Sequence, residues 1–261
     1  MKKQTFILIF ITAMIMPLWA QTAADFRVAF TSDRTGVIIR GYSGAELQVV
    51  IPNTIQFMPV KEIGREAFRS SNITSIVIPE GVTIIHESAF ADCSELSSVT
   101  LPNSLTSIDA FAFSNCTSLS SIIFPNSLTI IGRGAFQESG LTSVSWPAGI
   151  HVISSRAFYN CKNLQSVTIP EGITTIGSFA FFGCSGLTTI ALPRTINRIN
   201  EGAFNSCTAL TTVTIPSSVR SINFSEQEPQ NLSEIKSFSG CSYMSSASQR
   251  ALRRVGYTGD F

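Results

Sequence analysis

The chain of 261 residues holds 18 lysines and arginines against 17 aspartates and glutamates, and only 13% of its residues are charged. Removing residues 1–20, which contain Lys2 and Lys3, leaves 16 basic and 17 acidic residues, a net charge of −1. Nucleic acids attract clustered lysines and arginines, so this balance argues against nucleic acid, and equally against anionic membranes, as partners. The one basic cluster, Arg250, Arg253 and Arg254, is predicted to be a solvated helix face.

Residues 1–20 are predicted to be a secretory signal peptide. Lys2 and Lys3 precede an apolar run from Phe6 to Met16, and the small residue Ala20 suits a signal peptidase. The run is shorter than the about 20 residues that span a bilayer, which disfavours the alternative, a membrane anchor. We therefore expect cleavage near Ala20, an exported chain and no integral membrane span after cleavage.

Residues 21–50 are predicted to be an N-terminal cap. The end coils of a repeat array must be covered, and we expect Phe26 to Val50 to do this as short antiparallel strands.

Residues 51–244 repeat one phrase with a period of 22 or 23 residues. Proline marks the register, an isoleucine follows six residues later and the pair Ala-Phe begins ten residues later. This period is typical of leucine-rich repeats, in which each coil is one supersecondary unit. We predict about eight coils, the first opened by Pro52. The other marker prolines are Pro79, Pro102, Pro125, Pro147, Pro170, Pro193 and Pro216.

One coil, Leu164 to Phe182, shows how each unit is expected to fold. Leu164–Ile169 has the spacing LxxVxI of a short strand that faces a core, and Pro170 ends it because proline has no N–H to donate. Ser178–Phe182 is predicted to be a short helical or 3-10 turn. A single coil cannot bury its apolar stripe, so stacked coils must share a core. The predicted fold class is a β-rich repeat solenoid of the α/β type, with a parallel β-sheet on one face, short helical or 3-10 turns on the other, and a cap at each end.

The consensus LxxVxIPxxIxxIxxxAFxxCxxL resembles the BspA-like, or treponemal-type, leucine-rich repeats of bacterial surface and secreted proteins. The lead-in from Gly36 to Gly64 and the tail from Ser246 to Phe261 are also similar to segments of that family. The resemblance implies a solenoid outside the cytoplasm that binds proteins of a host or of neighbouring cells in an adhesin-like manner. It offers no catalytic residues to carry over.

Six cysteines recur with the repeat, each three residues after the Phe of the Ala-Phe slot. Recurrence in one slot favours small buried groups with free thiols over a disulfide framework. Bridges between adjacent coils, such as Cys93–Cys116, remain the alternative, because neighbouring strands lie near the lower limit of disulfide geometry. No CxxC or His pair points to zinc, and no metal is predicted. The cysteines are Cys93, Cys116, Cys161, Cys184, Cys207 and Cys241.

Residues that could carry catalysis are scattered. His86 and His151 occupy different slots in coils separated by two others. Acids such as Glu80 and Glu171 occur singly on turns, whereas glycosidases need two carboxylates across a cleft. A parallel β-helix carbohydrate lyase also stacks coils, but no acidic or basic cluster accompanies this repeat. We predict no enzyme activity and no cofactor.

The outward positions of the strand segments form the candidate binding face. They are mostly serine and threonine, so the face is either a plain solvated surface or a flat neutral surface for a partner. We expect that partner to be a protein, including a host extracellular protein, or a glycan. The candidate residues are Ser98, Thr100, Ser121, Ile123, Ser143, Ser145, Ser166, Thr168, Thr189, Ala191, Thr212 and Thr214.

The last coil carries an irregularity. It is about 11 residues longer than the others, and the excess falls at 223–235, a polar and acidic stretch. This segment is either a plain insertion beside the cap or a binding loop. Residues 245–261 are predicted to be a capping helix and tail, with Ala247, Ala251 and Val255 aligned on one helix face.

Together these features predict a monomeric, non-enzymatic protein-binding leucine-rich-repeat protein that is secreted or held at the cell surface. The alternative is a periplasmic or envelope scaffold that binds the producing cell's own components.

Overall fold

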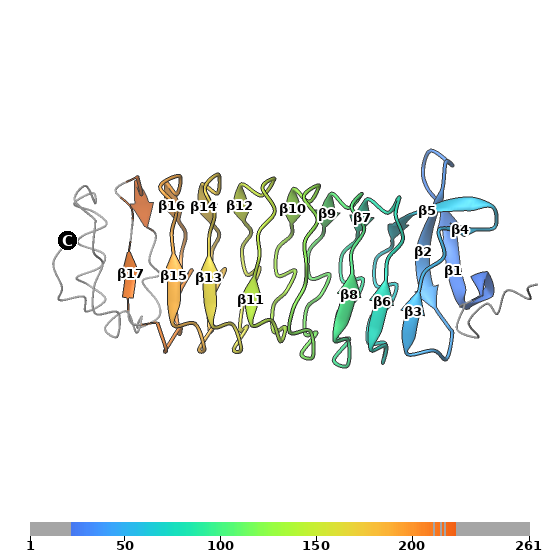
Figure 1. Cartoon of the computed structure of the whole chain (residues 1–261), viewed down its shortest axis with the longest axis horizontal. Helices are drawn as coiled ribbons and strands as arrows, with labels where there is room; N and C mark the ends of the chain where they lie inside the picture. The colour runs from blue at the N-terminus through green and yellow to red at the C-terminus, as the bar shows by residue number, and fades with distance from the viewer. Residues whose placement is uncertain (1–21, 211, 215, 217, 223–261) are drawn as a thin grey trace, which may run out of the picture.

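The computed structural model describes residues 22–210, 212–214, 216 and 218–222. They form a β-solenoid of about seven coils of about 23 residues, stacked side by side along a rod (Figure 1). The predicted repeat solenoid is confirmed. The predicted signal peptide at 1–20, the insertion at 223–235, the capping helix at 245–261 and the coil around Phe238 lie outside the described residues.

The N-terminal end of the rod begins with a 3-10 helix, η1 (Ala23–Asp25), followed by an antiparallel hairpin of β1 (Phe26–Phe30) and β2 (Val37–Tyr42). The Phe26 ring lies 5.3 Å from that of Tyr42, which in turn lies 5.7 Å from Phe68 of the first coil. The hairpin therefore extends the aromatic core past the first coil.

The first ladder of parallel strands is built from the LxxVxI segments, and we call its outward side the strand face (Figure 1). It is divided into two sheets because no strand is assigned at residues 120–124. Its members are β3 (Gln48–Val50), β6 (Ser75–Val77) and β8 (Ser98–Thr100), then β11 (Ser143–Val144), β13 (Ser166–Thr168), β15 (Thr189–Ala191) and β17 (Thr212–Thr214).

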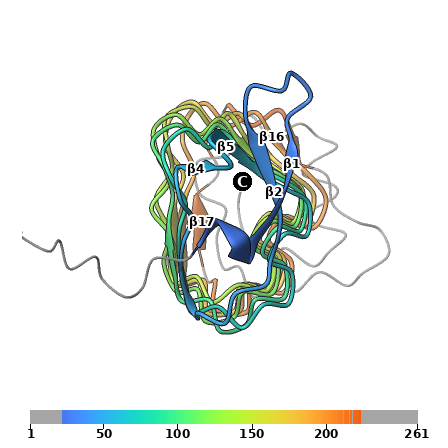
Figure 2. The ribbon, with the colours of Figure 1, turned by 90° about the vertical axis from the view of Figure 1, so that its right-hand side faces the viewer.

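A second parallel ladder, which the sequence analysis did not anticipate, lies at the recurring isoleucine slot. It begins on β2 and β5 (Met58–Ile63), and β4 (Thr54–Ile55) pairs with β5 antiparallel. Viewed along the rod, the two ladders occupy different sides of each coil (Figure 2). Its other members are β7 (Ile84–Ile85), β9 (Ser107–Ile108), β10 (Ile130–Ile131), β12 (Val152–Ile153), β14 (Thr175–Ile176), β16 (Arg198–Ile199) and β18 (Ser221–Ile222).

The core is a column of stacked phenylalanines, one from each coil. The rings of Phe90 and Phe113 lie 5.0 Å apart, and those of Phe113 and Phe136 lie 5.4 Å apart. Burying one such ring stabilises the fold by about 1.5–3 kcal/mol. The fully buried members are Phe68, Phe90, Phe113, Phe136, Phe158 and Phe181.

The Ala-Phe segments differ in local structure from the expected helical or 3-10 turns. Among the described residues η1 is the only helix, and each Ala-Phe segment is instead a run of tight turns. In the first coil the N–H of Ala67 donates to Gly64 O at 3.2 Å, whereas the N–H of Phe68 donates to Ala89 O of the next coil at 2.8 Å. Alternate N–H groups thus bond across coils, which an α-helix does not allow.

The turns need a left-handed backbone at two slots in each coil, and we call this side of the rod the turn side. In the first coil the slots are Glu66 and Ser70, both with φ of 56°. Later coils place glycine, asparagine or aspartate at many of these slots, the residues that tolerate positive φ best. No helix within the described ranges has the length and apolar character needed to span a bilayer.

The cysteine column lies beside the phenylalanine column. All five described cysteines are buried and unbridged, as predicted, and each thiol donates to the carbonyl oxygen of a phenylalanine in the preceding coil, as Cys93 does to Phe68 O at 3.0 Å. Burial raises the pKa of Cys93 and Cys161 to about 11 and that of Cys207 to about 12. The cysteines are therefore structural groups rather than reactive thiols.

Candidate binding face

The strand face brings the predicted residues together in two parallel columns. Ser143 lies beside Ser166 and Ser166 beside Thr189, while Thr168 lies beside Ala191. Ser121, Ile123 and Ser145 lie outside assigned strands but occupy the same slots of their coils. The exposed members are Ser98, Thr100, Ser121, Ile123, Ser143, Ser145, Ser166, Thr168, Thr189 and Ala191, and the backbone of Thr212 and Thr214 continues the two columns.

The hydroxyl groups of this side of the coil divide into two classes. Those just before each strand bond to the preceding coil: Ser97 donates to Thr74 O at 3.1 Å, and Thr188 donates to Gln165 O at 3.1 Å. Ser98 and Ser166, by contrast, make no side-chain hydrogen bond to another described residue. The first class ties the coils together, and the second is left for solvent or a partner.

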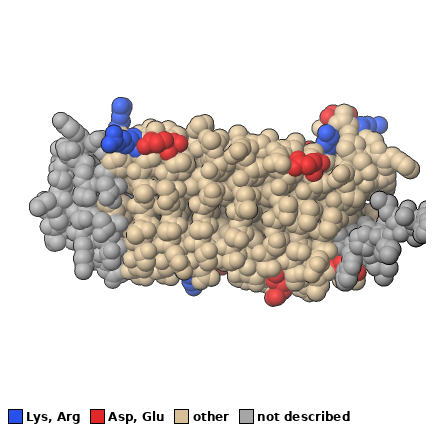
Figure 3. Space-filling model, in the orientation of Figure 1, with Lys and Arg blue, Asp and Glu red and all other residues tan. Residues whose placement is uncertain are grey.

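Charge is confined to the margins of the face. In the orientation of Figure 1, lysine, arginine, aspartate and glutamate appear near the upper and lower edges and toward the ends, and the broad middle carries none (Figure 3). A partner would therefore contact this surface through hydroxyl and apolar groups.

The N-terminal half of the face is more apolar than the sequence analysis anticipated. Val50 pairs with Val77 and both side chains are exposed, by 51% and 38%. Leu47 is 52% exposed just before β3, and Ile123 is 85% exposed farther along. Leu47 and Val50 were missed because residues 21–50 were assigned to the cap, although β3 in fact pairs with β6 in parallel. Val50 stands 27 residues before Val77, the spacing of Pro52 and Pro79, and that spacing could have revealed it.

His86 lies directly after β7 of the second ladder, between two carboxylates. Its Nε2 is 2.7 Å from Glu62 Oε2, and its Nδ1 is 3.1 Å from Asp109 Oδ2. Ser107 donates its hydroxyl to Asp109 at 2.7 Å rather than to the imidazole, so the cluster lacks the contact between a nucleophile and a base that acyl transfer needs. It links three coils through side-chain hydrogen bonds. His151 contacts Gly172 O through Nδ1 at 3.1 Å.

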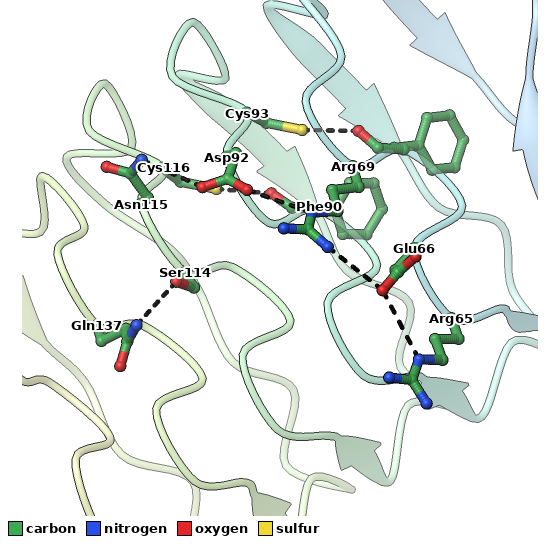
Figure 4. Close-up of polar contacts among 11 residues, drawn as sticks. Arg65, Glu66, Arg69, Phe90, Asp92, Cys93, Ser114, Asn115, Cys116 and Gln137 are labelled. Carbon is green, nitrogen blue, oxygen red and sulfur yellow. Dashed lines mark hydrogen bonds and ion pairs between the residues drawn. The ribbon is translucent and has the colours of Figure 1, made fainter.

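The turn side carries ion pairs in the N-terminal coils. Arg69 lies 3.4 Å from Glu66 and 3.3 Å from Asp92 of the next coil (Figure 4). Arg65 lies 3.4 Å from Glu87. Farther along, the same side is aromatic. Tyr159 stacks on Phe182 with ring centroids 4.8 Å apart, and the Arg156 guanidinium lies 5.5 Å from the Tyr159 ring.

No group of three or more His, Cys, Asp and Glu side chains is arranged to hold a metal ion in the described part of the chain. The described residues therefore form one long uncharged surface, the strand face, together with the His86 cluster and the ion pairs of the turn side, which connect neighbouring coils.

Comparison with known proteins points to one family. The sequence pattern described as BspA type leucine rich repeat region matches residues 61–150 and 129–251, with six copies. None of the curated proteins matches the chain. A leucine-rich repeat protein of T. pallidum, known from its crystal structure, is 29% identical, with a TM-score of 0.69 and coverage of 92% of this chain and 98% of its own.

A leucine-rich repeat protein from Bacteroides ovatus shares the fold at 23% identity, with a TM-score of 0.61 over 84% of this chain and 68% of its own. The family pattern spans well over half of the sequence, and the chain belongs to the BspA-type leucine-rich-repeat family.

Proposed function

We propose that this chain is an exported, non-enzymatic protein whose strand face binds another protein. The observation that carries the proposal is the uncharged face itself. Hydroxyls of its two columns such as Ser98 and Ser166 make no side-chain hydrogen bond to another described residue, and exposed valine and isoleucine side chains stand among them. Leucine-rich-repeat solenoids use such extended surfaces for binding.

The size of the face suits a protein partner. Eight strand positions spaced about 4.8 Å apart extend over roughly 35 Å, and a standard interface buries about 800 Å² on each partner. The centre of a protein interface is depleted of charge and its rim is polar. The face has this arrangement, with the exposed Ile123 side chain toward its middle and charged residues at its edges.

A matched pair of substitutions tests the site. Ile123→Asp places a charge in the strand face, and Phe57→Asp places one at the β4–β5 turn, where Phe57 is fully exposed. Each variant is passed over immobilised extracellular matrix proteins and over envelope proteins of the producing cell. The proposal is supported if Ile123→Asp weakens binding at least about tenfold and Phe57→Asp leaves it unchanged. A tenfold loss is expected when a central contact contributes more than about 1.4 kcal/mol to the free energy of binding. Equal binding by both variants contradicts the proposal.

Location decides between the adhesin-like function and the envelope scaffold. Export is proposed from the charged and apolar pattern of residues 1–20. Protease treatment of intact producing cells, followed by blotting of cells and medium, is the test. Loss from intact cells or abundance in the medium supports an external partner. Protection until the outer envelope is broken supports the scaffold and directs the search to the cell's own components.

A further inference from the structure

The coil that contains Phe136 is one residue shorter than its neighbours on the turn side. Phe136 and the next core leucine, Leu141, are five residues apart, whereas Phe113 and Leu119, or Phe158 and Leu164, are six apart. A pocket of about 260 Å³ lies at this place, and we call it the notch. Its polar lining includes Asn115, Thr117, Glu138, Asn160, Lys162 and Asn163.

The backbone around the notch is held rigidly by the repeat. Asn115 and Asn160 occupy left-handed slots with φ of 58° and 54°. Their N–H groups donate to the next coil, to Gln137 O at 2.8 Å and to Phe182 O at 2.6 Å. Gly140 approaches the backbone so closely that a Cβ there would lie 2.2 Å from Thr117 O. The backbone of the lining is therefore fixed before a ligand arrives, which lowers the entropic cost of binding.

The chemistry of the lining is amide-rich and electrically balanced. Asn115 gives one Nδ2–H to Asp92 at 3.2 Å, which leaves its Oδ1 and a second N–H for a ligand. Lys162 and Glu138 carry opposite charges, and neither forms an ion pair within the described residues. The notch thus presents both donors and acceptors around a net charge of zero.

We propose that the notch binds one residue of a neutral sugar. An asparagine amide can donate to one hydroxyl of a vicinal diol and accept from the next, and the notch is lined by Asn115 and Asn163 from two different coils. The Oδ1 of Asn160, a third lining residue, lies against Gly183 of the following coil. The volume of the notch lies just below the about 300 Å³ at which drug-sized ligand sites begin, a size for a single sugar ring. This inference does not rest on the strand face: it concerns a different side of the coil and a different class of ligand.

Saturation-transfer NMR on the full chain, with galactose, mannose, fucose and N-acetylglucosamine as probes, tests the inference. At least one sugar is expected to bind. Asn163→Ala is expected to weaken that binding about two- to tenfold, the effect of losing one or two hydrogen bonds. Asn197→Ala removes an exposed asparagine of another coil that does not line the notch, and it should leave binding unchanged.

Three results would overturn the proposal: no transfer from any of the sugars, transfer that Asn163→Ala leaves unchanged, and binding of free serine without binding of any sugar. The last result would assign the notch to a zwitterion held by Lys162 and Glu138. Thermal unfolding of each variant confirms that it is folded. Ile123→Asp should keep its sugar binding, so failure of the strand-face proposal and failure of this one are distinguishable.

Discussion

The strand face and the turn side are built from the same coils, yet they tolerate variation differently. On the strand face, serine and threonine replace one another from coil to coil, because each needs only to be small and to suit an extended backbone. On the turn side, the side chain at a slot has to fit the residue at the same slot of the next coil. The rings of Phe111 and Phe179 lie over Gly134 and Gly202 of the next coils, where a Cβ would approach the ring to 2.6 and 2.5 Å.

Function can therefore vary at little cost in stability on the strand face. A substitution on the strand face changes the surface offered to a partner and leaves the stacking of coils intact. A substitution on the turn side disturbs the contact between two coils.

The largest effect is expected in the core shared by both sides. Phe136→Ala should lower the free energy of unfolding by about 3–5 kcal/mol, because it removes a fully buried ring and leaves a cavity. Urea unfolding followed by circular dichroism measures it. Phe57→Ala, at a fully exposed phenylalanine, is the control and should change stability by less than about 0.5 kcal/mol. Equal losses for the two variants would contradict the assigned core.

The cysteine column should make stability fall at alkaline pH. The pKa of Cys93 is raised by burial from 9.0 to about 11, so above pH 9 the unfolded chain releases protons that the folded chain still holds. Stability is fully present below pH 9 and falls as the pH rises toward 11, by about 1.4 kcal/mol per pH unit for each thiol.

Cys93→Ala isolates this contribution, because tyrosines and lysines also titrate in the same range. Unfolding under reducing conditions at pH 8 and pH 10 should show a smaller alkaline loss in the variant, by about 1.4 kcal/mol. Identical losses in the two proteins would show that the thiol ionises as readily in the fold as in the unfolded chain.

A matched pair compares the two sides directly. Gly134→Ala should lower the free energy of unfolding by at least about 1–2 kcal/mol. Alanine at a φ of 61° is strained, and its Cβ would meet the Phe111 ring. Ser143→Ala on the strand face should change stability by less than about 0.5 kcal/mol. Adding Phe111→Ala to Gly134→Ala should recover the steric part of the loss. A strand-face variant as damaging as the glycine variant would refute the contrast.

The smallest effect is expected at the exposed ion pairs of the turn side. Asp92→Asn removes the charge that faces Arg69 at 3.3 Å while asparagine still tolerates the left-handed backbone. The loss should be between 0 and about 1 kcal/mol and should shrink in high salt. Thermal unfolding at low and high ionic strength measures it, and a larger loss that salt does not reduce would rule out an exposed electrostatic contact.

The core could be predicted from the sequence because every coil repeats it. The isoleucine, phenylalanine and cysteine columns recur at one period, and a recurring apolar slot in a solenoid has to face the shared interior. The neutral strand face followed from the same register, since residues between inward positions of a strand point outward.

Features that depend on contacts between coils were harder to predict. The Ala-Phe pairs were predicted to form helical or 3-10 turns, because neither residue type indicates that its N–H group bonds to the next coil. The glycines and asparagine at recurring slots, Gly134, Asn160 and Gly202, are the signal that could have indicated a backbone with positive φ. The second ladder has strands of only two residues in most coils, too short for a period-two pattern to emerge. Glu62 and Asp109 lie 24 and 23 residues from His86, about one period away, and comparing adjacent coils in register could have brought them together.

The most direct test of the strand face as a binding surface is site-specific photo-cross-linking on producing cells and their targets. A photoreactive amino acid is placed at position 123 on the face or at position 57 on the β4–β5 turn, two exposed apolar sites on different parts of the rod. We expect a discrete protein adduct from position 123 and none from position 57. The same adducts from both positions, or adducts from position 57 alone, would contradict the claim that the strand face is where this solenoid meets its partner.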